Sequence, residues 1–243
     1  MTALMAKELS RSFGEEVAVD DIDLEIHPGE IHAIVGLNGA GKTTLMRLML
    51  GMLRPGTGQA TILGSGAQQA PREVWGKVGH LIEAPFAYPE LTVRENITAS
   101  ALLHEVPAGS MADSVAATID DFELGHWADR RATTLSLGNR QRLGLASALV
   151  HEPSVLVLDE PANSLDPAGV VFIRGLLERY AARDAAVFVS SHHLDQLARV
   201  AHRITVLHRG RVVGTLDPAG VDLEQQFFDL VYGYDLAHEQ AGV

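Results

Sequence analysis

The chain has 243 residues, 47% of them hydrophobic, which is enough for one large α/β domain with its own buried core. Its formal net charge of −12 argues against nucleic acid and against an anionic lipid surface as the main partner. The absence of cysteine from the sequence excludes disulfides and thiolate metal sites and fits a reducing compartment.

The start of the chain is interrupted by Lys7 and Glu8, where a secretory signal would need an apolar segment. In the sequence, no uninterrupted apolar run approaches the roughly 20 residues of a membrane-spanning helix. We therefore expect any role at a membrane to depend on another chain that spans it.

Residues 2–9 and 17–26 alternate weakly between apolar and polar side chains, which predicts two strands of an antiparallel arm joined through residues 10–14. A turn then leads into a buried strand over residues 30–35. Phe13, in the connection, could stack on an adenine ring or could equally well pack within the hairpin.

The stretch after this strand matches the phosphate-binding loop pattern and consists of Gly36, Leu37, Asn38, Gly39, Ala40, Gly41, Lys42, Thr43 and Thr44. Its glycines would let backbone N–H groups wrap around phosphates, which a β-carbon would obstruct. The helix predicted over residues 43–50 would place its positive dipole end beneath the same anion. Lys42 can reach the β and γ phosphates, and the Thr43 hydroxyl can ligate Mg²⁺, so the loop predicts a nucleoside triphosphate site.

The middle of the chain changes from strand to helix. A short strand is predicted over residues 59–63, a linker over 64–71, and a buried strand over 77–82 that ends at Glu83. Helices are predicted near residues 92–104, 111–121 and 139–150. We interpret this segment as a helical insertion in an otherwise parallel-sheet domain.

The sheet resumes at residues 154–158, and a helix over 167–183 leads to a strand over 185–189. Residues 204–207 and 211–215 are predicted to pair through a turn, and residues 222–232 to form a last helix.

Polar side chains follow three of the predicted strands, at the edge of the sheet where functional groups gather in α/β proteins. Asp159, after the strand over residues 154–158, could hold Mg²⁺ through its water shell, and Glu160 could polarise a water for attack on the γ phosphate. An acidic pair after a strand is often only a turn or a helix cap, but behind a phosphate loop the catalytic interpretation is favoured. His192, after the strand over residues 185–189, could donate to the γ phosphate or to the attacking water, although a lone histidine there is more often merely exposed. The sequence contains no His-Glu-x-x-His pattern, and we predict no zinc site.

With the phosphate-binding loop and the acidic pair in this order, the chain resembles the nucleotide-binding subunits of ATP-binding cassette (ABC) transporters. The specific mark is a stretch similar to the signature motif of that family, at residues 135–143, which contains Ser136 and Gly138. Residues 163–166 resemble the loop after the catalytic glutamate, residues 190–192 the switch-histidine segment, and Phe13 the base-stacking aromatic. The resemblance covers essentially the whole chain.

Two positions depart from the commonest pattern of the family. In the signature, Leu137 and Asn139 replace a glycine and a glutamine. Glu83 stands where the family usually has the glutamine that couples Mg²⁺ and the attacking water to the membrane subunit, and a carboxylate there can accept a hydrogen bond or approach the metal but cannot donate. These changes, with residues 91–96, are similar to the bacitracin-export and lantibiotic-immunity branch of multidrug exporters.

The resemblance implies a single domain over residues 1–243, with a RecA-like P-loop NTPase core of mixed sheet (1–84 and 151–220), an N-terminal antiparallel β arm, an inserted helical subdomain (about 85–150) and a C-terminal helix (about 221–243). It implies an ATPase with ATP and Mg²⁺ as cofactors, in which Lys42, Glu160 and His192 are catalytic and Thr43, Asp159 and Glu83 face the metal. Two copies would pair head to tail, so that Ser136 and Gly138 of one cap the ATP of the other.

The partner implied is a transmembrane permease subunit, which would place this chain in the cytoplasm, on the inner face of the membrane through that partner alone. The function implied is to power export, of a drug, an antibiotic or a peptide. The alternative is a soluble cassette ATPase that remodels a protein or cofactor-assembly complex. A phosphate-loop kinase or GTPase is disfavoured, because the signature and switch histidine are present and an Asn-Lys-x-Asp guanine motif is not.

Overall fold

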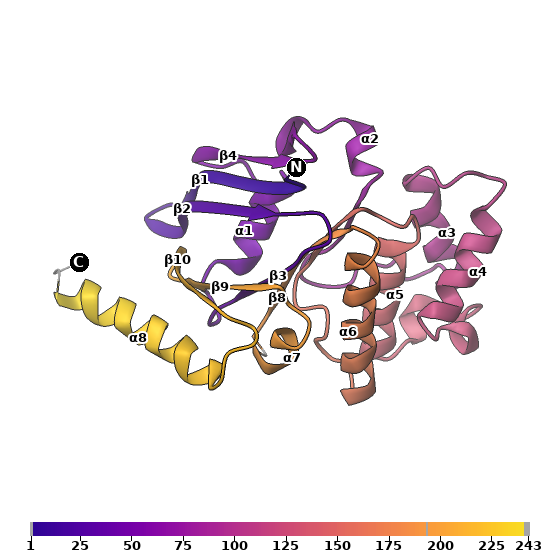
Figure 1. Cartoon of the computed structure of the whole chain (residues 1–243). Helices are drawn as coiled ribbons and strands as arrows, with labels where there is room; N and C mark the ends of the chain where they lie inside the picture. The colour runs from indigo at the N-terminus through magenta and orange to yellow at the C-terminus, as the bar shows by residue number, and fades with distance from the viewer. Residues whose placement is uncertain (1, 193, 241–243) are drawn as a thin grey trace.

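A computed structural model describes residues 2–192 and 194–240, and it places two sheets and their helices in layers (Figure 1). The larger sheet has six strands in the order β10-β9-β3-β8-β7-β6. Their bounds are β3 Ile31–Val35, β6 Val78–Leu81, β7 Val155–Leu158, β8 Ala186–Ser191, β9 Arg203–His208 and β10 Arg211–Leu216. Neighbouring strands from β9 to β6 are parallel, whereas β10 is antiparallel to β9. The predicted mixed sheet is therefore confirmed.

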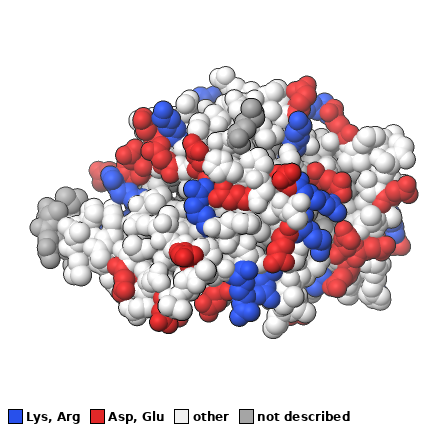
Figure 2. Space-filling view, viewed as in Figure 1, with Lys and Arg blue, Asp and Glu red and all other residues white. Residues whose placement is uncertain are grey.

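The smaller sheet is the predicted antiparallel arm, with four strands in the order β2-β1-β4-β5. Their bounds are β1 Leu4–Phe13, β2 Glu16–Ile26, β4 Thr57–Ile62 and β5 Ser65–Gly66. The edge strand β2 carries Glu16, Asp20, Asp21, Asp23 and Glu25, and Figure 2 shows acidic side chains gathered over this end of the arm. Charge along an exposed edge disfavours pairing with another strand.

The helices are α1 Lys42–Met49, α2 Arg72–Trp75, α3 Val93–Leu103, α4 Met111–Asp121, α5 Leu137–Leu149, α6 Pro167–Ala181, α7 Leu194–Ala198 and α8 Leu223–Gln240. Short 3₁₀ turns occur at Ala67–Gln69, Gly125–Trp127 and Ala132–Thr134. Among the residues that the structure describes, no helix combines the length and the apolar character that a bilayer crossing requires.

Alternation along the central strands divides the core into two layers. In β7, Leu156 and Leu158 join the cluster under α3–α6, whereas Val155 and Val157 join the cluster that contains α1 and the arm. All four side chains of β7 are buried, as expected for a parallel strand covered on both faces. Helices thus cover one face of the large sheet, and α1 with the small sheet covers the other (Figure 1).

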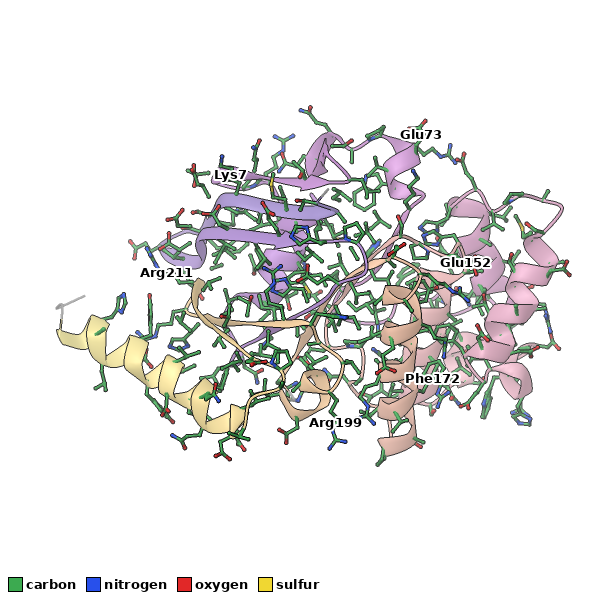
Figure 3. The ribbon with its side chains drawn as sticks, in the orientation of Figure 1. Lys7, Glu73, Glu152, Phe172, Arg199 and Arg211 are labelled. Atoms are coloured by element: carbon green, nitrogen blue, oxygen red, sulfur yellow. The ribbon has the colours of Figure 1, made fainter. Side chains whose placement is uncertain are left out.

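Side chains fix the two sheets and the helical layer to each other. Arg211 of β10 forms an ion pair with Asp20 of β2, with Nη2 and Oδ2 2.5 Å apart, which joins the two sheets (Figure 3). Phe172 of α6 packs edge-on against Phe122, with ring centroids 5.3 Å apart, and the guanidinium of Arg142 from α5 lies over its ring. These contacts join α6 to α5 and to the end of α4; Phe172 is labelled in Figure 3.

Several predicted bounds differ from the observed ones. The strands of the arm continue through residues 10–13, and the turn shrinks to residues 14–15. The predicted linker over 64–71 contains β5, because residues 65–66 pair with the end of β4. The last helix extends to Gln240 instead of ending at residue 232, and residues 241–243 of the expected C-terminal helix lie outside the described residues.

Candidate nucleotide site

The phosphate-binding loop joins β3, between β8 and β9, to α1. Two of its glycines are required for a reason other than the predicted one. A Cβ on Gly36 would lie 2.3 Å from the Leu207 carbonyl oxygen, and one on Gly41 would lie 2.2 Å from that of Ala18. The backbone of neighbouring segments thus excludes larger residues at both positions. Gly39, with φ of +80° and open space around it, fits the predicted role of a residue free to wrap around a ligand.

Lys42 lies buried beneath the loop. Its Nζ donates to the carbonyl oxygens of Gly36 and Leu37 at 2.7 and 3.3 Å. Burial lowers the pKa of this ammonium, and the nearby carboxylates of Glu160 and Asp159 raise it in opposition. The loop, the lysine and the two carboxylates are therefore electrostatically coupled.

A chain of hydrogen bonds joins the ends of three elements. Thr43 Oγ1 donates to Asp159 Oδ2 at 2.6 Å, and Ser190 Oγ donates to Asp159 Oδ1 at 2.5 Å. The same Ser190 hydroxyl accepts from the Glu160 N–H at 2.9 Å. Both oxygens of Asp159 are thus oriented by α1 and β8, which fixes the carboxylate at the carboxyl end of β7.

Glu160 and His192 form the outer part of the site. His192 Nδ1 lies 2.8 Å from Glu160 Oε2, and the His192 N–H donates to the same oxygen at 3.3 Å. Glu160 adopts a left-handed backbone conformation with φ of +50°, which non-glycine residues seldom take. The end of β8 thus orients the carboxylate that follows β7.

A cavity of about 540 Å³ brings most of the predicted site residues together. Its lining includes Phe13, Asn38, Gly39, Ala40, Gly41, Lys42, Thr43, Thr44, Asp159, Glu160 and His192. Gly36 and Leu37 instead line an adjoining cavity of about 410 Å³ against α8, to which Asn38 and His192 also contribute. Phe13 is 46% exposed, and the Arg11 guanidinium lies 4.9 Å from its ring centroid.

Besides Gly36 and Leu37, three further predicted site residues do not line the larger cavity. Ser136 is exposed, and its Oγ accepts from the Asn139 N–H at 3.3 Å as the N-cap of α5. Gly138 lies in the first turn of α5, where a Cβ would be 3.2 Å from the Ser164 carbonyl oxygen. Glu83, predicted to face the metal, forms an ion pair with Arg47 instead, with Oε2 and Nη2 2.5 Å apart.

The oxygen atoms at the end of α1 and β7 fit a magnesium ion. The Thr43 hydroxyl and the Asp159 carboxylate are hard ligands and already lie within hydrogen-bonding distance of each other. Mg²⁺ typically takes one or two protein oxygens and completes its shell with phosphate and water. A pair of protein ligands beside a phosphate loop is the donor set that such an ion requires.

Two residues important for the geometry were not assigned a role from the sequence. Ser190 positions the Asp159 carboxylate and the Glu160 backbone N–H, and the only sequence signal was its place after a buried strand. Gln141 of α5 is buried, and its Nε2 donates to the Pro161 carbonyl oxygen at 3.0 Å. Gln141 stands among the polar residues Asn139, Arg140 and Arg142, so it carried no distinct signal, and its partner comes from a distant segment.

Comparisons with known proteins agree with this geometry. The family model described as "ABC transporter" matches residues 19–163. The bacitracin transport ATP-binding protein BcrA of Bacillus licheniformis is 33% identical over 213 residues, which cover 87% of this chain and 69% of that protein. The Nod factor export ATP-binding protein I of Paraburkholderia xenovorans (strain LB400) is 32% identical over 219 residues, which cover 90% of this chain and 72% of that protein.

A solved structure described as the ATP binding subunit of an ABC transporter has the same architecture, with a TM-score of 0.87 and 25% identity. The match covers 94% of this chain and 99% of that one. The predicted P-loop fold is confirmed, and the similarity to a bacitracin transport protein agrees with the branch that the sequence resembles. The chain therefore belongs to the ABC transporter family, as an ATPase that supplies the ATP-binding subunit.

Proposed function

We propose that the chain hydrolyses Mg²⁺-bound ATP in the cavity between α1, β7 and β8, and so powers export through a separate transmembrane subunit. The observation that carries this proposal is the continuous set of contacts Thr43–Asp159–Ser190–Glu160–His192 beside the phosphate-binding loop. Each of these side chains comes from the edge of the fold where a phosphate group would meet them.

The residues have distinct roles in this proposal. Loop N–H groups and Lys42 bind the phosphates, Phe13 stacks on the adenine, and Thr43 and Asp159 hold the metal. Bound Mg²⁺ would neutralise charge on the phosphate oxygens. Glu160 orients and polarises the attacking water, and His192 fixes Glu160 through Nδ1. Positioning and charge supply most of the rate in phosphoryl transfer, so this rigid network is suited to it.

A second copy of the chain would complete the site. Ser136 and Gly138 stand at the N-terminus of α5, where a hydroxyl and backbone N–H groups can face a phosphate of another copy. Neither residue lines the cavity of its own chain, and Ser136 is exposed, which supports a head-to-tail homodimer across two ATP molecules. Gln141 would pass closure of the dimer from α5 to the segment after Glu160 through its bond to Pro161.

The membrane subunit would dock on an exposed apolar surface that surrounds a groove of about 350 Å³. This docking surface consists of Met52, Phe86 and Leu103, which line the groove, and of Tyr88 and Leu102, which line a second hollow that shares Leu103. The exposed fractions of these five side chains range from 43 to 70%. ATP-binding subunits of this family act with transmembrane subunits, and a group of exposed apolar side chains favours a protein partner. The chain would then lie on the inner face of the membrane, and the partner would hold the exported drug, antibiotic or peptide.

The proposal is tested by capturing the partner of the Glu160→Gln variant from solubilised membranes in the presence of Mg²⁺ and ATP. We expect ATP binding with very slow hydrolysis, and a multi-span protein recovered in stoichiometric amount. The Lys42→Ala variant serves as the control, because it should bind no ATP and recover less partner. A soluble partner, with ATP hydrolysis by the unmodified chain intact, would instead support the remodelling ATPase. Undiminished nucleotide affinity of Lys42→Ala would contradict the nucleotide site itself.

A further inference from the structure

The Arg47–Glu83 ion pair lies between the nucleotide site and the groove of the proposed docking surface. Arg47 is on α1, one turn after Thr43, and it lines the groove. Glu83 follows the end of β6, adopts a left-handed conformation with φ of +64°, and is absent from the residues that line the nucleotide cavity. The carboxylate that was predicted to face the metal is thus paired with Arg47 outside the site.

Glu83 nevertheless leaves the sheet beside the metal ligands. Strands β6 and β7 pair in parallel with Leu81 opposite Leu158, and the Asp159 N–H still donates to the Leu81 carbonyl oxygen at 2.7 Å. Glu83 comes two residues after Leu81, so its backbone starts next to Asp159. Thr43 and Arg47 lie four residues apart and so occupy the same face of α1. The Glu83 carboxylate therefore has two possible positions along that face, one beside Thr43 and one beside Arg47.

Electrostatics decides between these two positions. With Asp159 and Glu160 already present, a third carboxylate beside Thr43 would be repelled, and the guanidinium of Arg47 offers a better partner. Next to a bound divalent cation, the same carboxylate would instead be attracted toward the site. The Arg47 and Glu83 side chains are 36 and 56% exposed, and an ion pair so exposed contributes little to stability. It can therefore be exchanged at small cost.

We infer that Arg47 is a positioning residue, which holds Glu83 outside the nucleotide cavity and thereby sets how strongly nucleotide binding depends on Mg²⁺. The inference rests on the proposed function, because it requires Mg²⁺ and nucleotide to bind at Thr43 and Asp159. Loss of the guanidinium frees Glu83, which then repels the phosphates when the metal is absent and approaches the metal when it is present. Both effects increase the difference in nucleotide affinity between the two conditions.

The test measures the dissociation constant of a fluorescent AMP-PNP analogue in EDTA and in saturating Mg²⁺. The quantity compared between variants is the dissociation constant in EDTA divided by that in Mg²⁺. Arg47→Gln should raise this ratio about three- to fivefold, on the scale of one exposed ion pair, whereas Arg47→Lys should keep it near the starting value. In a Glu83→Gln background, Arg47→Gln should have no effect on the ratio. Arg72→Gln is the matched control, because Arg72 forms a similar exposed ion pair with Glu105 at 2.8 Å.

An unchanged or lower ratio in Arg47→Gln would overturn the inference, as would a rise that persists in the Glu83→Gln background. Thermal unfolding of each variant checks folding, and Arg47→Met, which keeps an unbranched stem, replaces a glutamine variant that fails to fold. Lys42→Ala separates the two proposals. If it still binds the analogue, the nucleotide site is wrong; if it does not and the Arg47→Gln ratio is unchanged, only the role of Arg47 is wrong.

Discussion

Among single residues, His151 shows how burial changes the chemistry of an ordinary side chain. Its ring stacks on that of His104, with centroids 3.8 Å apart, and its Nε2–H donates to the Val78 carbonyl oxygen at 3.2 Å. Its Nδ1 is buried, and in the described part of the chain that atom has no hydrogen-bond partner. Burial, aided by the positive charge that His104 can carry, lowers the pKa of His151 to about 4.

This lowered pKa predicts loss of stability in mild acid. The folded chain binds fewer protons at His151 than the unfolded chain does, so the stability present above about pH 6.5 falls as the pH drops toward 4. The His151→Gln variant can still donate to the Val78 carbonyl oxygen. We expect its free energy of unfolding to fall by on the order of 2 kcal/mol less than that of the unmodified chain over this pH range. Urea unfolding at a series of pH values measures it, with exposed His126→Gln as the control. Equal slopes for His151→Gln and the unmodified chain would contradict this prediction.

The site residues show a clear difference between what a pattern can and cannot reveal about a side chain. Asp159 and Glu160 were identified because an acidic pair follows a buried strand behind a phosphate loop. Ser190, which orients both, carried no such signal, because its role arises only when β8 lies beside β7. Glu83 was expected at the metal, but the guanidinium that pairs with it comes from α1, 36 residues earlier in the chain.

Between elements, α5 and the loop after β6 are in close contact. A Cβ on Gly144 would lie 2.4 Å from Pro85 Cβ and 3.0 Å from Pro85 Cα. Because Cα belongs to the backbone, it cannot yield as a flexible side chain would. Pro85 therefore holds the loop in direct contact with α5, the helix that Ser136 caps. The same loop carries Glu83.

We expect Gly144→Ala to destabilise the protein by about 1–3 kcal/mol, because the overpacked methyl must push the loop away from α5. Gly175→Ala on α6 is the matched control: a Cβ there meets no atom within 4 Å, and alanine should stabilise that helix by up to about 1 kcal/mol. Denaturant unfolding measures both changes. A Gly144→Ala variant as stable as Gly175→Ala would show that the loop is not held against α5.

The types and chain order of the longer elements followed from periodicity, whereas the short helices α2 and α7 were not predicted and several ends differ. Helix α5 begins at Leu137, two residues before the prediction, because the Ser136 hydroxyl caps it. Strand β5 was missed, since a two-residue strand has too few side chains for alternation and forms only by pairing with β4.

For the molecule as a dimer, we expect head-to-tail pairing to require that the side chain at position 136, which caps α5, carries no negative charge. Replacing Ser136 with Asp or Asn keeps a good N-cap, and the two replacements are similar in size. In a Glu160→Gln background with Mg²⁺ and ATP, we expect Ser136→Asn to retain a dimer in part. Ser136→Asp should raise the dissociation constant of the dimer at least about tenfold above that of Ser136→Asn, because a carboxylate would face the phosphates of the other copy.

Analytical ultracentrifugation distinguishes these two states, and circular dichroism checks that both variants keep their helix content. Equal dimerisation of the Asp and Asn variants would rule out contact between Ser136 and a bound phosphate. Loss of the dimer in both, with normal ATP binding, would indicate that size at this position matters more than charge.

Contiguous residues were enough to predict the phosphate-binding loop, the acidic pair after a buried strand, the chain order of the longer strands and helices, and the resemblance to the ABC family. Packing between distant segments was needed to learn at which glycine positions the backbone excludes a larger residue, which hydroxyl contacts Asp159 and Glu160, and where the Glu83 carboxylate points. These depend on atoms brought together from segments far apart in the chain. Local patterns fix the chemistry that a segment can offer, whereas packing and charge between segments fix where that chemistry is placed.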